Sequence, residues 1–485
     1  MLRLGNELFT TTGLKSKLDE YINGGEHEKV LLTIGVLVEL LFCDQQNVAK
    51  LFGHSMLDDY CQKVGARIEA EHETSSERRT ELTSATVTFI VSRLQVSGGH
   101  TAVLLDFIGI LVEKYAVSVI ITGVGGVTEP GVFEILCNKF PQVKVSVIKE
   151  KSLVSKVIAI QKTIAYTSPY CVYVFSHHQD SVAIASVQPH QGYVVKFVHH
   201  ADHHLSLGVF LPWVQHIDLH PNGYHTCREL LGISNKYYPM MVDDRHVVER
   251  ITNSRNNVFI TCTAARSNKV EVPYVFPYVD VVPELLNVTK GIHVHIGIIS
   301  ARAQSRIRKR LDVLGIKQSS FVYIDQVTSV WDTLLEYNVD LYLGSFPYGG
   351  ARTLIEVMGA GVPAAVHMHS TSRMLGTHDM IYPGAIFWKT PDELFTKIKK
   401  IDTAFLDKQR IMARLHYEQY HSREMLSDVI LNEAQVAPKL LKDDYTSDLF
   451  ESALGALRDE KLKRLLLNWF YVRFRIFRSF KVLYI

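Results

Sequence analysis

The chain has 485 residues, of which 47% are hydrophobic and 21% are charged, and its formal net charge is +2. This length exceeds what one ordinary core accommodates, so we expect two globular domains with appended segments. The near-neutral charge gives no general case for nucleic-acid binding, and we predict no nucleic-acid partner.

Six cysteines stand at positions 43, 61, 137, 171, 227 and 262, and no two of them have CxxC spacing. We therefore expect reduced thiols in a cytoplasmic protein, and we predict neither a metal site nor a bound cofactor. The first seven residues lack the pattern of a signal peptide. Residues 31–42 are apolar but too few to span a bilayer, and they predict a buried helix.

Residues 1–82 have no strand pattern, and we predict that they form a helical preamble. From residue 83 onward short apolar runs alternate with helical segments. We expect strands at residues 86–91, 117–122, 143–148, 170–175, 193–198 and 216–219. This alternation predicts a parallel sheet covered by helices on both faces, and we assign it to a first Rossmann-like domain at residues 83–250.

The pattern restarts after a polar break at residues 253–257. We expect the second set of strands at residues 258–262, 292–299, 321–324, 339–343, 363–366 and 385–388. Residues 251–402 are therefore predicted to form a second Rossmann-like domain. The predicted fold class is α/β, with two Rossmann-like domains whose sheets face a cleft from their carboxyl ends.

The last part of the chain is predicted to be helical from residue 392. Residues 461–485 alternate basic residues with aromatic and aliphatic ones, too often for a membrane-spanning helix. An amphipathic helix on a membrane surface fits this tail, although a helix that packs against a partner or a further domain fits it too.

A glycine-bearing loop follows the strand at residues 339–343. Gly349 and Gly350 allow the backbone to approach a ligand closely. The helix that starts next offers free N–H groups and a positive dipole end, which suit a phosphate group. Glu356, in its second turn, can reach the hydroxyl groups of a ribose. We predict a nucleotide diphosphate site from this segment, with Ala351, Arg352 and Thr353 in the first turn of the helix; a plain strand-to-helix turn is the alternative.

The segment has a recognisable counterpart. Residues 340–350, the pair Thr353-Leu354 and the turn at residues 359–363 resemble the donor site of the O-GlcNAc transferase group and its bacterial relatives, which are GT-B glycosyltransferases. The resemblance covers residues 255–390. It implies a nucleotide-sugar donor, most simply a UDP-sugar, and last helices at residues 403–460 that pack back on the first domain.

The resemblance also implies donor-binding residues outside the glycine loop. The segment that ends in Thr371, Ser372 and Arg373 is similar to one that lies against the donor phosphates in that group. Arg266 and Lys269 follow the first strand of the second domain, where such enzymes often place a basic residue. The first domain resembles these enzymes mainly in the order of its elements and in the turn with Gly98, Gly99 and His100. A solvated basic residue or a simple tight turn is the alternative for each of these positions.

Histidines are concentrated after the fifth strand, at His199, His200, His203 and His204, with Asp202 among them. Neighbouring side chains on a strand or loop point in different directions, which disfavours a shared zinc ion. A transfer that inverts the sugar needs a base for the acceptor hydroxyl. We predict Asp202 as this base, with His203 or His200 as its substitute or proton-sharing partner. The alternative is that the cluster only positions the acceptor.

One departure from the family bears on stereochemistry. Retaining GT-B families often have two glutamates eight positions apart, and Tyr348 stands eight positions before Glu356. We therefore expect inversion of the anomeric centre. From the basic aromatic tail and the family resemblance we expect a role in bacterial surface polysaccharide or glycolipid synthesis at the cytoplasmic face of the inner membrane. The acceptor is a saccharide, a lipid-linked group or a protein. Protein O- or N-glycosylation, a nucleotide-sugar epimerase and a non-catalytic scaffold are the alternatives.

Overall fold

Parallel strands form two separate sheets in the computed structural model, which describes residues 10–43, 49–74, 83–96, 99–245, 258–369 and 373–438. The chain divides into one unit of Met1–Tyr238 with Ile430–Ile485 and a second unit of Pro239–Val429. The predicted membrane-surface tail at residues 461–485 lies outside the described residues. Each unit is α/β, as predicted.

The first unit contains a seven-stranded sheet in the order β3-β2-β1-β4-β5-β6-β7. Its strands are β1 (Thr83–Val91), β2 (Ala116–Ile121), β3 (Lys144–Val147), β4 (Pro169–Phe175), β5 (Val194–His199), β6 (Gln215–Asp218) and β7 (Asn235–Tyr237). All of the neighbouring strands are parallel. Apolar side chains on both faces of β1 and β4 are buried, as a parallel sheet between helices requires.

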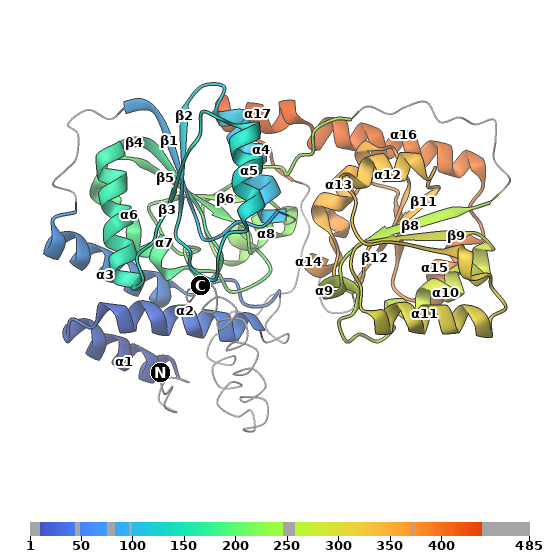
Figure 1. Cartoon of the computed structure of the whole chain (residues 1–485), viewed down its shortest axis with the longest axis horizontal. Coiled ribbons are helices and arrows are strands. Elements are labelled where there is room, and N and C mark those ends of the chain that lie inside the picture. The colour runs from blue at the N-terminus through green and yellow to red at the C-terminus, as the bar shows by residue number, and fades with distance from the viewer. Residues whose placement is uncertain are drawn as a thin grey trace. The chain divides into compact units, whose positions relative to one another are not determined.

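Helices cover both faces of this sheet (Figure 1). They are α1 (Thr11–Asn23), α2 (His27–Cys43), α3 (Ser55–His72), α4 (Gly99–Leu111), α5 (Pro130–Lys139), α6 (Leu153–Thr167), α7 (Ser181–Ser186) and α8 (Pro221–His225). The preamble is helical, and it shares one core with the sheet: Leu14, Val38 and Ile68 are buried in the same cluster as Ile90 and Val174. The preamble is therefore part of the first unit.

The preamble also holds the loop that follows β5. Asp58 of α3 accepts hydrogen bonds from the backbone N–H groups of Gly208 and Phe210 at 2.6 and 2.8 Å. The N–H of Ala49 donates to the carbonyl of His203 at 2.7 Å. The predicted base segment is thereby tied to helical structure that lies more than a hundred residues earlier in the chain.

Asp58 predicts a specific dependence of stability on pH. Burial raises the pKa of Asp58 from 3.8 to about 7, although the two backbone hydrogen bonds oppose this change. The folded state therefore binds more protons than the unfolded state between these values, so the free energy of unfolding should fall as pH rises from about 4 to about 7. The pKa difference corresponds to at most about 4 kcal/mol.

Urea denaturation of the wild type and of Asp58→Asn across this pH range measures the effect. The asparagine variant should lack this part of the slope because it does not titrate. Equal slopes in the two proteins would show that Asp58 has an ordinary pKa in the folded state.

The second unit contains a six-stranded parallel sheet in the order β10-β9-β8-β11-β12-β13. Its strands are β8 (Ile260–Ala264), β9 (Ile292–Ile296), β10 (Phe321–Ile324), β11 (Leu341–Leu343), β12 (Ala364–His367) and β13 (Ile386–Trp388). On one face lie α10 (Tyr278–Thr289), α11 (Ala301–Val313) and α15 (Pro391–Ile398), and on the other α12 (Val330–Glu336), α13 (Ala351–Gly359) and α16 (Thr403–Tyr420) (Figure 1).

The division between the units differs from the predicted boundaries. It follows Tyr238 instead of residue 250, because the segment after β7 is bound by the second unit. The N–H of Val242 donates to the carbonyl of His421, and the hydroxyl of Tyr417 donates to the carbonyl of Val242 at 2.7 Å. Helix α16, expected to pack back on the first domain, packs against α13 of the second unit. Helix α17 (Arg423–Leu431) ends just beyond Val429, where the second unit ends.

The second sheet has the strand order 3-2-1-4-5-6 that is typical of a Rossmann-like fold, and the first has the same order with a seventh strand beside the sixth. The order reverses between β1 and β4 in the first sheet and between β8 and β11 in the second. Ligands of such sheets bind at the carboxyl ends of the strands beside this reversal. The loops that follow these strands are therefore the places to look for a site. No helix in the described ranges combines the length and the apolar character needed to cross a membrane.

Candidate active site

The glycine loop joins β11 to α13 at the reversal of the second sheet. Gly349 is enclosed: a Cβ atom there would lie 2.1 Å from Thr377 Oγ1 and 2.8 Å from the carbonyl oxygen of Gly376. Its N–H donates to the carbonyl of Leu375 at 2.7 Å. Gly350 precedes α13, and a Cβ atom there would be no nearer than 3.4 Å to its neighbours. Close packing therefore demands glycine at position 349 but not at position 350.

Lys269 reaches this loop, as the prediction of a shared site requires. Its ammonium group, at the end of α9 (Ser267–Val270), donates to the carbonyl of Gly349, and its own carbonyl accepts from the N–H of Tyr348 at 3.4 Å. Burial lowers the pKa of Lys269 to about 8, so the group is still mostly protonated at neutral pH. Arg266, three residues earlier, is exposed.

Two side chains that were predicted to bind the donor form hydrogen bonds within the protein. The carboxylate of Glu356 accepts the backbone N–H of Trp331, at the start of α12, at 3.1 Å. Burial raises the pKa of Glu356, and this hydrogen bond opposes the increase. Arg352 donates to the carbonyl of Met241 at 2.8 Å. Their roles at a ribose and a phosphate stay predictions, and the geometry gives each side chain a structural task as well.

The remaining predicted donor residues are placed only in part. Ala351 and Thr353 lie in the first turn of α13, beside the glycine loop. Arg373 begins α14 (Arg373–Gly376), and the orientation of its side chain is not described. Gly98, Thr371 and Ser372 lie outside the described residues.

Aromatic side chains beside the glycine loop were not predicted. The ring of Tyr348 stacks on that of His369 with 6.2 Å between centroids, and Tyr274 lies 5.0 Å from the same imidazole. The hydroxyl of Tyr274 also bonds His367 Nε2 at 2.8 Å. Burial lowers the pKa of both histidines to about 4, so their rings are neutral. The signal in the sequence was the pair His367 and His369, directly after the strand predicted at residues 363–366.

The first unit brings two predicted segments together. Helix α4 begins at Gly99 after β1, and its second residue, His100, lies 4.5 Å from the ring of His200. The Nε2–H of His100 donates to the carbonyl of Phe175 at 2.9 Å. Burial lowers the pKa of His100 to about 4 and that of His200 well below its usual value. Both imidazoles are therefore neutral, and His200 is a weak base.

Asp202 and His203 form a pair in which only the histidine is well exposed. The Nδ1 atom of His203 lies 3.2 Å from Asp202 Oδ1, and the side-chain exposures are 45% and 10% respectively. Burial opposes ionisation of Asp202, but His220 and the hydrogen bond from His203 outweigh it, and the pKa is lowered. The carboxylate is thus ionised, and its contact with Nδ1 leaves Nε2 as the second nitrogen of an imidazole that is 45% exposed.

The backbone of α8 closes over the carboxylate of this pair. A Cβ atom on Gly223 would lie 2.9 Å from Asp202 Oδ2. A side chain at position 223 would force Asp202 to move, so glycine permits the close approach that helps to bury the carboxylate.

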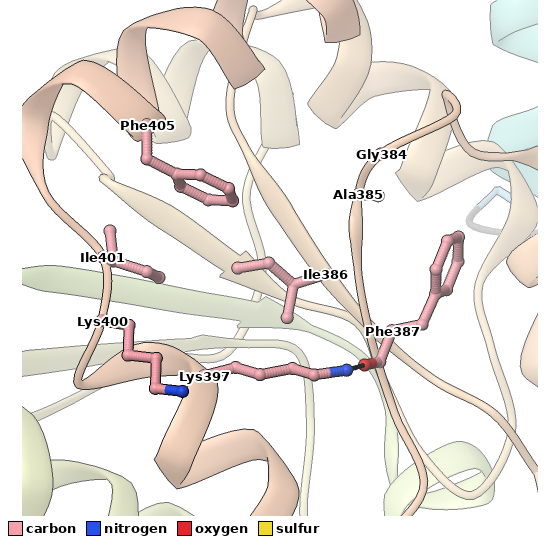
Figure 2. Close-up of a pocket in the computed structure, with 8 residues that line it drawn as sticks. All are labelled: Gly384, Ala385, Ile386, Phe387, Lys397, Lys400, Ile401 and Phe405. Carbon is pink, nitrogen blue, oxygen red and sulfur yellow. Dashed lines mark hydrogen bonds between the residues drawn. The ribbon is translucent and has the colours of Figure 1, made fainter.

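A cavity of about 390 Å³ lies apart from these groups, between β13 and the helices α15 and α16. Figure 2 shows that Ile386, Ile401 and Phe405 line it, while Lys397 points to the carbonyl of Phe387. That carbonyl accepts from Lys397 at 2.6 Å. None of the predicted site residues lines the cavity, and the ionisable groups of its lining are Lys397 and Lys400.

Comparison with known proteins finds similar proteins by structure but not by sequence. No protein-family model matches the sequence, and no curated protein sequence matches it. HepE of Anabaena, solved with UDP-glucose, is 14% identical with a TM-score of 0.53 over 72% of this chain and 98% of HepE. A glycosyltransferase of Rickettsia africae is 13% identical with a TM-score of 0.55 over 73% of this chain and 100% of its own.

A third solved structure, the lipopolysaccharide outer core galactosyltransferase WaaB, is 14% identical with a TM-score of 0.50 over 72% of this chain and 100% of WaaB. These similarities establish the fold. The prediction of two Rossmann-like domains of the GT-B type is confirmed.

Proposed function

We propose that this protein transfers a sugar from a nucleotide diphosphate donor, most simply a UDP-sugar, to a hydroxyl acceptor. The observation that carries the proposal is the glycine loop at the strand reversal of the second sheet, with Lys269 bound to it. Solved structures of the same fold support it, since one of them contains UDP-glucose and another is a galactosyltransferase.

In this proposal the second unit binds the donor. The N–H groups at the start of α13 and the ammonium of Lys269 face the diphosphate, and they stabilise the negative charge that develops as the sugar departs. The resemblance to the O-GlcNAc transferase group implies Arg373 as a second cation. The rings of Tyr348 and His369 offer a flat surface for the nucleobase.

The first unit binds the acceptor. His203 accepts the proton of the acceptor hydroxyl at Nε2 while the oxygen attacks the anomeric carbon, and Asp202 stabilises the resulting imidazolium. This assignment moves the base from Asp202 to its partner, because the carboxylate is nearly buried and has a lowered pKa. A single displacement by the acceptor inverts the anomeric centre, in agreement with the absence of a second glutamate at Tyr348.

For the biological setting we propose bacterial surface glycan synthesis, and the tail and the likeness to WaaB support this proposal. Surface polysaccharide or glycolipid synthesis at the cytoplasmic face of the inner membrane agrees with a basic, aromatic segment at residues 461–485. Deleting this segment should abolish binding to anionic vesicles, and undiminished binding would refute the membrane contact. Protein glycosylation is the alternative acceptor chemistry.

Thermal unfolding in the presence of a panel of nucleotides and nucleotide sugars tests the donor site. A transferase of this kind should be stabilised by UDP and by its own donor, with a concentration dependence set by the dissociation constant. A scaffold without a donor site would show no shift with any compound. An epimerase would bind its nucleotide sugar but release no nucleotide.

A further inference from the structure

Four polar side chains of the first unit converge in its interior, beside the candidate base. They are His199, His216, Asp218 and Cys227, and one ligand-type atom from each lies within 4.8 Å of the corresponding atoms of the others. The side chains of His199, His216 and Asp218 are at most 1% exposed, and Cys227 is fully buried. The proposed transfer mechanism uses none of them.

Different elements supply these side chains. His199 is the last residue of β5, and it stands opposite Asp218 in the register with β6. His216 lies two positions before Asp218, so both point to the same face of the sheet. Cys227 belongs to η4 (Thr226–Leu230), a π-helical turn that follows α8. Turns of this type occur frequently at functional sites.

Three of the four distances known between these ligand atoms fall in the range expected for the edges of a tetrahedron around a metal, and the fourth is shorter. Asp218 Oδ1 lies 3.0 Å from His199 Nδ1, 3.3 Å from His216 Nε2 and 3.5 Å from Cys227 Sγ, and this Sγ atom lies 3.5 Å from His199 Nδ1. Zinc–ligand bonds of about 2.0–2.3 Å at tetrahedral angles place neighbouring nitrogen, oxygen and sulfur ligands about 3.3–3.6 Å apart.

Hydrogen bonds account for this arrangement only if a hydrogen or a lone pair is shared between neighbours. Three groups, two imidazoles and a thiol, surround the single oxygen Asp218 Oδ1, which has two lone pairs. Three contacts of 3.5 Å or less join His199 Nδ1, Asp218 Oδ1 and Cys227 Sγ to one another. The imidazole N–H and the thiol S–H supply only two hydrogens for these three contacts. A cation inside the cluster would account for these four short contacts together.

The other carboxylate oxygen is fixed from outside the cluster. Asn235 of β7 donates its amide group to Asp218 Oδ2 at 2.6 Å and to the carbonyl of Tyr224 at 2.8 Å. Hydrogen bonds of this kind orient a carboxylate ligand so that its free oxygen faces the metal. An ionised aspartate and a thiolate also neutralise the two positive charges of a divalent ion, which a buried site requires.

We propose that this chain binds one structural Zn²⁺ ion through His199, His216, Asp218 and Cys227. Two nitrogens, one oxygen and one sulfur in a tetrahedral arrangement suit zinc, and four protein ligands leave no open position for a substrate. Binding displaces the thiol proton of Cys227 to solvent. The ion ties β5, β6 and the η4 turn together, and its ligand His199 stands three residues before Asp202.

Metal analysis of the full chain tests the proposal. Protein expressed with added zinc should contain about one zinc per chain. Cys227→Ala should lose it, whereas Cys171→Ala, a matched change at another buried cysteine of the same unit, should retain it. Wild-type protein without stoichiometric zinc, or a Cys227→Ala variant that keeps it, would overturn the proposal.

Cobalt replacement provides a readout on the wild-type protein, in case Cys227→Ala does not fold. Chelator-treated chain that takes up Co²⁺ should show the absorption of a tetrahedral site together with a thiolate-to-cobalt charge-transfer band. A spectrum of hexaaqua Co²⁺, without this band, would exclude the site. Neither measurement depends on sugar transfer, so the zinc proposal and the proposed function can fail separately.

Discussion

His203→Asn should lower the rate of sugar transfer by about 10²–10⁴-fold, the usual contribution of a general base. Its imidazole is the exposed member of the pair with Asp202, and the variant has no group to accept the hydroxyl proton at that position. The affinity for UDP should not change, because the glycine loop and Lys269 belong to the other unit. Steady-state kinetics with the purified chain, combined with calorimetric titration of UDP, separates the two effects.

His190 offers a matched control. It also pairs with a carboxylate, Glu69, at 2.9 Å, but it lies before β5 instead of after it. His190→Asn should keep wild-type turnover. If His203→Asn kept its activity while Asp202→Asn lost it, the base would be Asp202 itself, and loss of activity in neither variant would remove the pair from the mechanism.

Gly349→Ala should damage both stability and donor binding. The new methyl group would lie 2.1 Å from Thr377 Oγ1, so the loop or the turn after α14 must move. Such overpacking costs about 1–3 kcal/mol of the free energy of unfolding. UDP binding should weaken as well, since the carbonyl of Gly349 also holds the ammonium of Lys269.

Gly350→Ala separates the ligand effect from the packing effect. Its methyl group would have only ordinary contacts, at 3.4 Å or more, so the free energy of unfolding should stay near that of the wild type. If the backbone there touches the diphosphate, UDP affinity should still fall by about tenfold or more, which corresponds to about 1.4 kcal/mol. Wild-type affinity in Gly350→Ala would place the diphosphate elsewhere.

Local pattern was enough to predict most of the fold. Every described strand except β7 was expected, because most of the others are apolar or alternate apolar with polar residues between turn segments. Strand β7 has only three residues, with Lys236 in the middle, so its composition does not indicate a strand. Its hydrogen bonds to β6 hold it in the sheet. The order of the strands also follows from general rules for alternating α/β chains.

The site was predictable only where its residues are close in sequence. The glycine loop was found in this way. The contact of Glu356 with Trp331 depends on the packing of α12 against α13, so the sequence suggested a free carboxylate where the structure has a bonded one. The cluster around Asp218 was missed for the same reason: its ligands come from β5, β6 and η4, and their spacing has none of the short repeats that usually indicate zinc.

The central claim is that the chain moves a sugar from a nucleotide diphosphate donor. Incubation of the purified protein with individual nucleotide sugars, followed by NMR of the products, tests it most directly. We expect release of UDP from one donor, slowly to water and faster with an acceptor glycan, and a product with the opposite anomeric configuration. A panel in which no nucleotide is released, or in which the sugar is altered while still attached to its nucleotide, would contradict the account.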